Sequence, residues 1–177
     1  MRVIHVAVLG AVLCVCLAQS AQAQRVHPAA RIKELGIELP VINQPMANYV
    51  HAVRSGNLLV LAGKVSTQPD GSYITGKLGR DLTVDQGYQA ARRVAITQLA
   101  VLQAELGDLG KVKRIVKVLG MVNADPAFTD HPKVMNGFSD LMVEVFGEKG
   151  KHARSAVGVS SLPANAAVEV ELIVEIK

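Results

Sequence analysis

The end of the chain carries the clearest pattern of hydrophobic and polar positions. From residue 168 onward, aliphatic residues occupy every second position, and glutamates occupy most of the positions between them. The aliphatic set is Val168, Val170, Leu172, Val174 and Ile176, and the glutamates are Glu169, Glu171 and Glu175. Successive side chains of a strand point to opposite faces of a sheet, so this alternation predicts a strand with one buried face and one acidic face. A turn-rich stretch at 161–165, which contains Pro163, separates it from a further strand that opens with Arg154.

Two segments show the three- and four-residue spacing of amphipathic helices. The first begins at Thr83, which can form a capping box with Gln86, and it ends at Gly107. Its predicted apolar stripe is Val84, Tyr88, Ala91, Ala95, Leu99, Leu102 and Leu106, whereas Arg92, Arg93, Gln98, Gln103 and Glu105 are expected to lie mostly off the stripe. The second helix is predicted over 130–146, with Gly147 ending it.

Shorter apolar runs predict the remaining strands. Runs at 49–53 and 58–62 flank turn residues at 54–57 and indicate a β-hairpin. A weak strand is expected near 73–75 and a longer one over 112–122. The resulting order of strands and helices predicts an α+β domain. It has a five- or six-stranded, mostly antiparallel or mixed sheet with two helices on one face, and its acidic face meets solvent or another subunit.

The first 23 residues have the pattern of a secretory signal. Arg2 precedes an apolar core at 6–17, and Ala21 and Ala23 fit the small-x-small cleavage rule. This core is shorter than the roughly 20 apolar residues of a membrane span, which makes an uncleaved membrane helix the weaker alternative. We therefore expect an exported, periplasmic protein with no membrane anchor after cleavage. Residues 24–44 are expected to form a loose lead-in with a short helix at 28–35, and residues 45–177 the domain.

Composition narrows the chemistry. Both cysteines lie in the predicted signal, so the mature chain would have no disulfide and no cysteine nucleophile. A net charge of +4 and 3% aromatic residues give little support for nucleic-acid binding. The basic cluster of Lys111, Lys113, Arg114 and Lys117 is read as a solvated face, and His51, His131 and His152 lack metal-ligand spacing and are read as surface residues. No Gly-x-Ser-x-Gly motif is present, which argues against a serine hydrolase.

The segment from 154 to 171 resembles the closing motif of the RidA (YjgF) family, Arg-Ser-x-Val-x-Val-x-x-Leu-Pro-x-x-Ala-x-Val-Glu-Ile-Glu. The matching residues are Arg154, Ser155, Val157, Val159, Leu162, Pro163, Ala166, Val168, Glu169 and Glu171. The order of elements also resembles the family fold, which is similar to chorismate mutase. The resemblance extends over roughly 41–177, with the lead-in and insertions of a longer subgroup, here one predicted to be exported.

The resemblance implies a homotrimer with active sites between subunits and no metal or organic cofactor. The activity it implies is hydrolysis of small enamine and imine carboxylates, 2-aminoacrylate and 2-iminobutanoate, to 2-oxo acids and ammonia. Arg154 matches the arginine that binds the substrate carboxylate, and Glu169 matches the glutamate that positions or activates water. The matches for substrate binding are Tyr49, Gly63, Asn136 and the backbone carbonyl of Ala156.

Four residues depart from the family pattern: Asn48, Ala62, Lys64 and Ala156. Ala62 removes a hydroxyl beside Gly63, which would alter the substrate. Three alternatives stay open at this point. Arg154 could be a structural ion-pair partner of Glu169 or Glu171. The trimer could bind small carboxylates without turnover, or it could be an endoribonuclease, an activity also attributed to family members.

Overall fold

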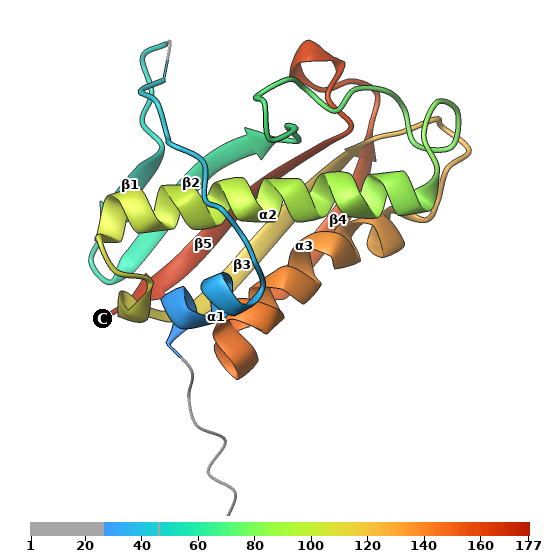
Figure 1. Ribbon diagram of the computed structural model, residues 1–177. Helices are drawn as coiled ribbons and strands as arrows, with labels where there is room; N and C mark the ends of the chain where they lie inside the picture. Colours follow the sequence, from blue (N-terminus) through green and yellow to red (C-terminus); the bar gives the residue numbers. More distant parts are fainter. Residues whose placement is uncertain (1–26, 46) are drawn as a thin grey trace, which may run out of the picture.

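The computed structural model describes residues 27–45 and 47–177 (Figure 1). The predicted signal at 1–23 lies outside the described residues. The helices and strands in chain order are α1 (Pro28–Glu34), β1 (Ala52–Ser55), β2 (Leu58–Val65), α2 (Val84–Leu106), β3 (Val112–Asn123), α3 (His131–Phe146), β4 (Ala153–Val159) and β5 (Val168–Ile176). Short 3-10 turns are η1 (Leu109–Lys111), η2 (Gly147–Gly150) and η3 (Pro163–Asn165).

The strands form one five-stranded mixed sheet in the order β1-β2-β5-β3-β4. The β3–β4 pair, which α3 connects, is parallel, and the other three pairs are antiparallel. The C-terminal strand β5 therefore lies in the middle of the sheet, and β4 lies at one edge. This confirms the predicted fold class.

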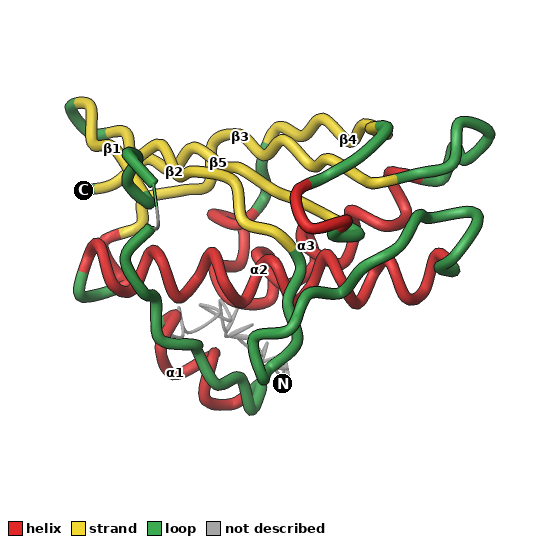
Figure 2. Tube along the Cα trace, turned by 90° about the horizontal axis from the view of Figure 1, so that it is seen from above, coloured by secondary structure: helices red, strands yellow, loops and turns green. Residues whose placement is uncertain are grey.

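Helices α2 and α3 pack side by side on one face of the sheet, and none of the described helices covers the other face (Figures 1 and 2). The alternation of β5 explains this, because its aliphatic residues are buried toward the helices and lie in the core. The capping box of α2 forms as predicted, with Gln86 N bonded to Thr83 Oγ1 at 3.2 Å and Thr83 N bonded to Gln86 Oε1 at 2.8 Å. Gly107 ends the helix in the left-handed region, at φ 71°.

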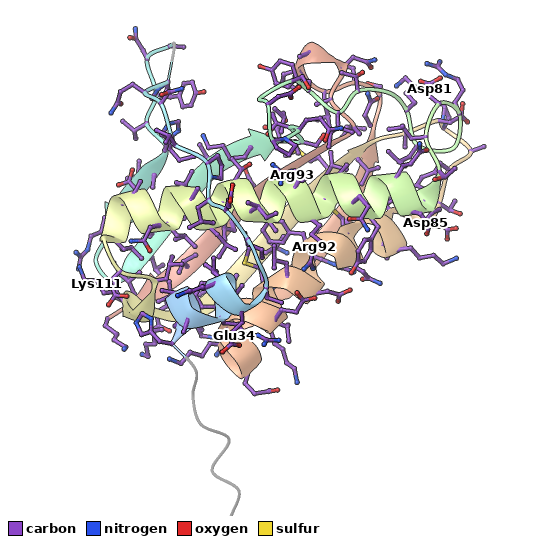
Figure 3. The ribbon with its side chains drawn as sticks, in the orientation of Figure 1. Glu34, Asp81, Asp85, Arg92, Arg93 and Lys111 are labelled. Carbon is purple, nitrogen blue, oxygen red and sulfur yellow. The ribbon has the colours of Figure 1, made fainter. Side chains whose placement is uncertain are left out.

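The lead-in is packed, not loose. Ile32 of α1 is buried, and four further aliphatic residues of the segment lie against the core: Leu35, Ile37, Leu39 and Ile42. The segment after α1 crosses over α2 on its way to β1 (Figure 1). The charged side chains labelled in Figure 3 lie on α1, on α2 and in the segments next to α2. Among them, Arg92 of α2 makes a bidentate pair with Glu144 of α3, at 3.1 and 2.7 Å.

Two strand predictions need correction. The hairpin forms, but β1 begins at Ala52, three residues later than predicted, and its turn contains only Gly56 and Asn57. The expected strand at 73–75 makes only isolated bridges, Thr67 with Tyr73 and Thr75 with Ala166. The runs at 49–53 and 73–75 both border turns. Too few of their backbone groups lie opposite a partner strand there, so a longer ladder of hydrogen bonds does not form. None of the described helices is long and apolar enough to cross a bilayer.

Candidate functional site

Arg154 lies on the edge strand β4, and its side chain reaches α3. Nη1 donates to Asn136 Oδ1 at 3.1 Å and to Ser139 Oγ at 2.9 Å, and Nη2 donates to the Pro132 carbonyl at 3.3 Å. The guanidinium is partly buried, and this desolvation lowers the pKa of Arg154, while the charge of Asp140 acts in the opposite direction. The structure thus brings together Arg154 on β4 and Asn136 on α3, two of the predicted substrate-binding residues.

His152 belongs to the same cluster, which corrects the prediction that it is a surface residue. Its ring is partly buried and lies edge-on to Phe138, with centroids 6.3 Å apart. Its Nδ1 lies 2.6 Å from the Gly150 carbonyl and its Nε2 lies 3.1 Å from Ser139 Oγ. Burial lowers the pKa of His152, and Arg154 adds to that effect, while the hydrogen bond to Gly150 opposes it.

Sequence reasoning missed Ser139 and His152. A usable signal existed for Ser139, because it follows Asn136 by three positions and therefore shares its side of a helix. His152 had no comparable signal, because it precedes β4 in a loop whose path depends on tertiary packing.

Glu169 marks a second cluster, on the face of the sheet away from the helices. Its neighbours Val168 and Val170 are fully buried under the helices, so the intervening side chain points to the open face. A Cβ added at Gly63 would overlap Glu169 Oε1, which means that the carboxylate occupies space left open by this glycine. Gly63 is thus a point of close approach for the Glu169 side chain. Desolvation, then the charge of Glu171, raises the pKa of Glu169, and Lys64 opposes them.

Lys64 stands at the end of a short hydrogen-bonded chain near Glu169. Its Nζ lies 2.7 Å from His51 Nδ1, and His51 Nε2 lies 2.6 Å from the Asn43 carbonyl. A carbonyl only accepts, so Nε2 carries the proton and Nδ1 accepts from the lysine. Burial lowers the pKa of Lys64 and Glu169 opposes that shift. The departure from the family at this position therefore places an anchored amine near the carboxylate.

A buried glutamine shapes the strand at Gly63. The register of β2 against β5 shifts between Leu61 and Lys64, which marks a β-bulge at Ala62 and Gly63. Gln98 of α2 is fully buried, and its amide nitrogen donates to the carbonyls of Ala62 (3.0 Å) and Val170 (2.8 Å). The prediction that Gln98 lies off the packed stripe was wrong, because it overlooked this polar partner.

The two clusters do not meet within one chain. Arg154 is in register with Val118 and through it with Leu172, whereas Glu169 is in register with Met121 and through it with Val157. The two residues are therefore two strands and three positions apart, and their side chains leave the sheet on opposite faces. Among the described residues, neither shifts the pKa of the other.

The two other predicted ligand residues lie just before β1 and on β4. Tyr49 precedes β1 and is 54% exposed. Ala156 lies opposite Gly120, two residues after Arg154, and packs against the core.

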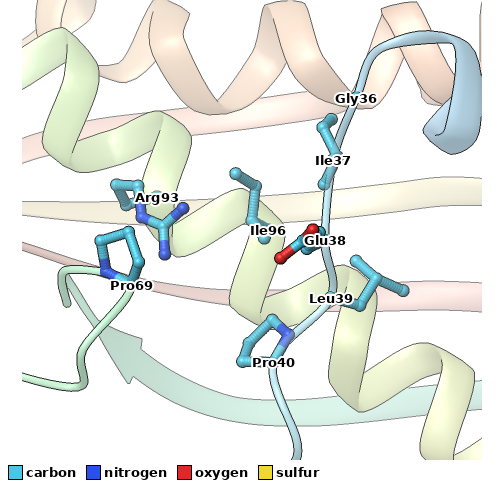
Figure 4. Close-up of a pocket in the computed structure, with 8 residues that line it drawn as sticks. All are labelled: Gly36, Ile37, Glu38, Leu39, Pro40, Pro69, Arg93 and Ile96. Atoms are coloured by element: carbon cyan, nitrogen blue, oxygen red, sulfur yellow. The ribbon is translucent and has the colours of Figure 1, made fainter.

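A cavity of about 340 Å³ lies elsewhere, between the lead-in and α2 (Figure 4). It is lined by Gly36, Ile37, Glu38, Leu39, Pro40, Pro69, Arg93 and Ile96. Glu38 and Arg93 enter it from opposite sides. It contains none of the predicted site residues, and Arg93 Nε is already bonded to the Thr67 carbonyl at 3.1 Å. The candidate site is therefore built from the two polar clusters and not from this cavity.

The comparisons with known proteins agree with this architecture. A family model described as "YjgF/chorismate_mutase-like, putative endoribonuclease" matches residues 29–176. Protein TCP17 of Trypanosoma cruzi is 48% identical over 149 residues, which cover 84% of this chain and 93% of that protein. A 2-iminobutanoate/2-iminopropanoate deaminase of Dermatophagoides farinae is 31% identical over 143 residues, covering 80% of this chain and 95% of the relative.

Solved structures give the same result. A protein of unknown function from Agrobacterium tumefaciens is 44% identical, with a TM-score of 0.79 and coverage of 85% of this chain and 92% of the other. RidA from a Psychrobacter species is 25% identical, with a TM-score of 0.52 and coverage of 79% and 98%. The family model spans the domain from α1 to β5, and the relatives cover most of its length. The chain therefore belongs to the YjgF/RidA family.

Proposed function

We propose that this protein is a cofactor-free hydrolase that deaminates small imine or enamine carboxylates to 2-oxo acids and ammonia. The observation that carries the proposal is the guanidinium of Arg154, which is held from one side by α3 while Nε has no acceptor among the described residues. An arginine held in this way can bind a planar carboxylate with two parallel N–H bonds. Family membership and the 31% identical deaminase support the same reaction class.

The reaction needs a carboxylate anchor and a proton acceptor. An enamine substrate reacts as its imine tautomer. Water adds to the carbon of the C=N bond and forms a C–O bond, Glu169 accepts the proton that the water loses, and Glu169 passes this proton to the imine nitrogen, which gives the carbinolamine. The carbinolamine then collapses: Glu169 takes the hydroxyl proton and delivers it to the nitrogen, the C–N bond breaks, ammonia leaves, and the carbon becomes the carbonyl of the 2-oxo acid. The raised pKa of Glu169 suits this exchange, because a carboxyl group titrating nearer neutral pH gives and takes a proton more readily.

We propose that one site combines Arg154 of one copy with Glu169 of another, in a homotrimer. The two side chains leave opposite faces of one chain, so a shared site needs a second copy. The open face of the sheet also exposes aliphatic side chains at Val53, Val60 and Val157, which are 58%, 44% and 41% exposed. A surface of that kind is typical of a subunit interface.

Ammonia release from freshly generated 2-iminobutanoate tests the function. Wild-type protein should accelerate it, Arg154→Ala should abolish the acceleration, and Arg154→Lys should restore only part, because lysine lacks the two-pronged geometry. Circular dichroism of each variant checks folding. Wild-type activity no higher than that of Arg154→Ala would refute the deaminase. Saturable, Arg154-dependent binding of 2-oxobutanoate without turnover would favour the alternative, a trimer that only binds small carboxylates.

The endoribonuclease alternative has less support in this chain. Its basic cluster is engaged in the structure, with Lys113 paired to Glu175 at 2.7 Å and Lys117 donating to Ser155 at 2.9 Å. A phosphate would have to compete with these contacts. RNA cleavage that persists through purification and is lost in Arg154→Ala would revive this alternative.

Export is a separate proposal, supported by the sequence of the first 23 residues. N-terminal sequencing of the protein secreted by a host cell should begin at Gln24. A product that retains Met1 would refute processing at this point.

A further inference from the structure

A chain of hydrogen bonds runs from the backbone through His152 to Arg154. Nδ1 of His152 faces the Gly150 carbonyl at 2.6 Å, Nε2 faces Ser139 Oγ at 3.1 Å, and Ser139 Oγ faces Arg154 Nη1 at 2.9 Å. A carbonyl oxygen cannot donate, so Nδ1 must carry the proton. In the neutral ring, Nε2 is then an acceptor, and the hydroxyl of Ser139 must donate to it. The donor and the acceptor of every hydrogen bond from Gly150 to Arg154 are thereby fixed.

This direction determines what Ser139 presents to Arg154. With its hydrogen committed to His152, the hydroxyl oxygen turns its lone pairs toward the guanidinium. Nη1 has two hydrogens, and Ser139 and Asn136 accept both. The Nε–H and one hydrogen of Nη2 remain, and Nε has no acceptor among the described residues. In a guanidinium, the edge formed by Nε and Nη2 fits a carboxylate in the side-on, two-pronged geometry.

We propose that Ser139 and His152 are positioning residues, which hold Arg154 so that its Nε–Nη2 edge faces the substrate carboxylate. This inference depends on the proposed function and adds two residues that the family resemblance does not assign. Ser139 acts through Arg154, and His152 acts through Ser139. Neither touches the substrate, so both should affect its binding more than the chemical step.

Protonation of His152 would reverse the arrangement. Both ring nitrogens then donate, Ser139 loses its acceptor, and a second cation stands close to Arg154. The Asp140 carboxylate on α3 acts on Arg154 and offsets part of this repulsion. Burial and Arg154 hold the pKa of His152 below its ordinary value of 6.5, so the ring is neutral at neutral pH. Acidification through that lowered pKa should therefore weaken substrate binding.

The test uses the full-length protein and compares Ser139→Ala, His152→Phe and His152→Gln. Ser139→Ala and His152→Phe should raise KM and the dissociation constant of 2-oxobutanoate roughly tenfold, the size of one lost charge-assisted hydrogen bond, with kcat nearly unchanged. His152→Gln keeps an acceptor near the position of Nε2, so it should bind 2-oxobutanoate nearly as wild type does. It should also lose the weakening of binding in acid, since glutamine does not titrate there.

His27→Gln is the matched control, because His27 caps α1 and contacts Asp108 far from β4. It should bind as wild type does and keep the acid dependence. If wild type neither binds 2-oxobutanoate nor releases ammonia, the proposed function fails. If wild type binds and Ser139→Ala and His152→Phe bind equally well, or His152→Gln keeps the acid dependence, the positioning role fails while the function stands. Thermal unfolding confirms that each variant is folded.

Discussion

At the scale of single residues, the candidate site depends on close contacts made by polar side chains. Gly63 is the clearest case, because the Glu169 carboxylate occupies the place of its missing side chain. Ser139 is a second case, since one hydroxyl connects a neutral histidine to an arginine. The side chains in both arrangements are common polar types. Partial burial shifts the pKa values of Glu169 and His152, and the direction of the hydrogen bonds decides which atoms donate and which accept.

Gly63→Ala should reduce activity with little loss of stability. The added methyl group overlaps the end of a flexible side chain and not backbone, so Glu169 can swing away at small cost. We expect a fall in kcat/KM of at least about tenfold, because the carboxylate leaves its place, and a change in unfolding free energy within about 1 kcal/mol. Ammonia release and urea unfolding measure the two effects. Full activity in this variant would contradict the role given to the Glu169 position.

Glu169→Gln should stabilise the protein above the pKa of Glu169. Desolvation and Glu171 raise the pKa of this carboxyl group in the folded state, so the folded protein holds its proton more tightly than the unfolded chain. The ionised carboxylate therefore reduces stability as pH rises from its ordinary pKa through the raised value. Urea unfolding should give a more stable variant at about pH 8 and a smaller difference at about pH 4. The opposite trend would contradict the environment described for Glu169, and activity should fall at both values.

The candidate site residues divide into those that a motif can identify and those that only packing reveals. Arg154 and Asn136 were predicted from their motif matches, and they are hydrogen-bonded in the structure. His152 was predicted to be exposed because a lone histidine in a polar loop has no periodic pattern around it. Its burial follows from the way η2 folds the loop against α3, which is a tertiary effect.

At the scale of elements, the bulge in β2 shapes the sheet around the candidate site. It allows Gly63 to meet Glu169 and displaces Lys64 by one position relative to β5. Gln98 stabilises the bulge from the side of the sheet that α2 covers, by donating to one carbonyl on each of the two strands. A polar side chain in the packed face of α2 thus has a specific structural task.

Gln98→Met should destabilise the fold. Methionine fills a similar volume but leaves the carbonyls of Ala62 and Val170 without their donor in a dry interior. We expect a loss of about 1–3 kcal/mol in the free energy of unfolding. Urea denaturation measures it, and Gln103→Met on the same helix, where the side chain bonds only the local Gly107 carbonyl, is the matched control. Equal stability of Gln98→Met and wild type would show that the bulge needs no donor.

Element prediction succeeded where local chemistry and periodicity agreed. The capping box at Thr83 and the glycine at 107 placed both ends of α2, and the strict alternation after residue 168 placed β5. It failed at the start of β1, where the apolar Tyr49 and Val50 are exposed and precede the strand. An apolar run alone does not reveal whether a partner strand reaches it, because pairing is decided by distant segments.

At the scale of the whole molecule, one chain carries the two polar clusters of the proposed site at different places on its sheet. The Arg154 cluster lies between β4 and α3 at one edge of the sheet, and the Glu169 cluster lies on its open face. Side chains on opposite faces of one sheet cannot hold the same small substrate. In the trimer that we propose, copies of the chain bring these two clusters together.

Mixing two inactive variants tests this claim most directly. Arg154→Ala and Glu169→Gln are each expected to lose nearly all ammonia release as pure proteins. If the two residues act from different subunits, unfolding and refolding the two variants together in equal amounts should form intact sites and recover about a quarter of wild-type activity, the statistical share in random trimers. If both residues of a site came from the same chain, no mixture would contain an intact site. Mixed protein as inactive as either parent would contradict the account.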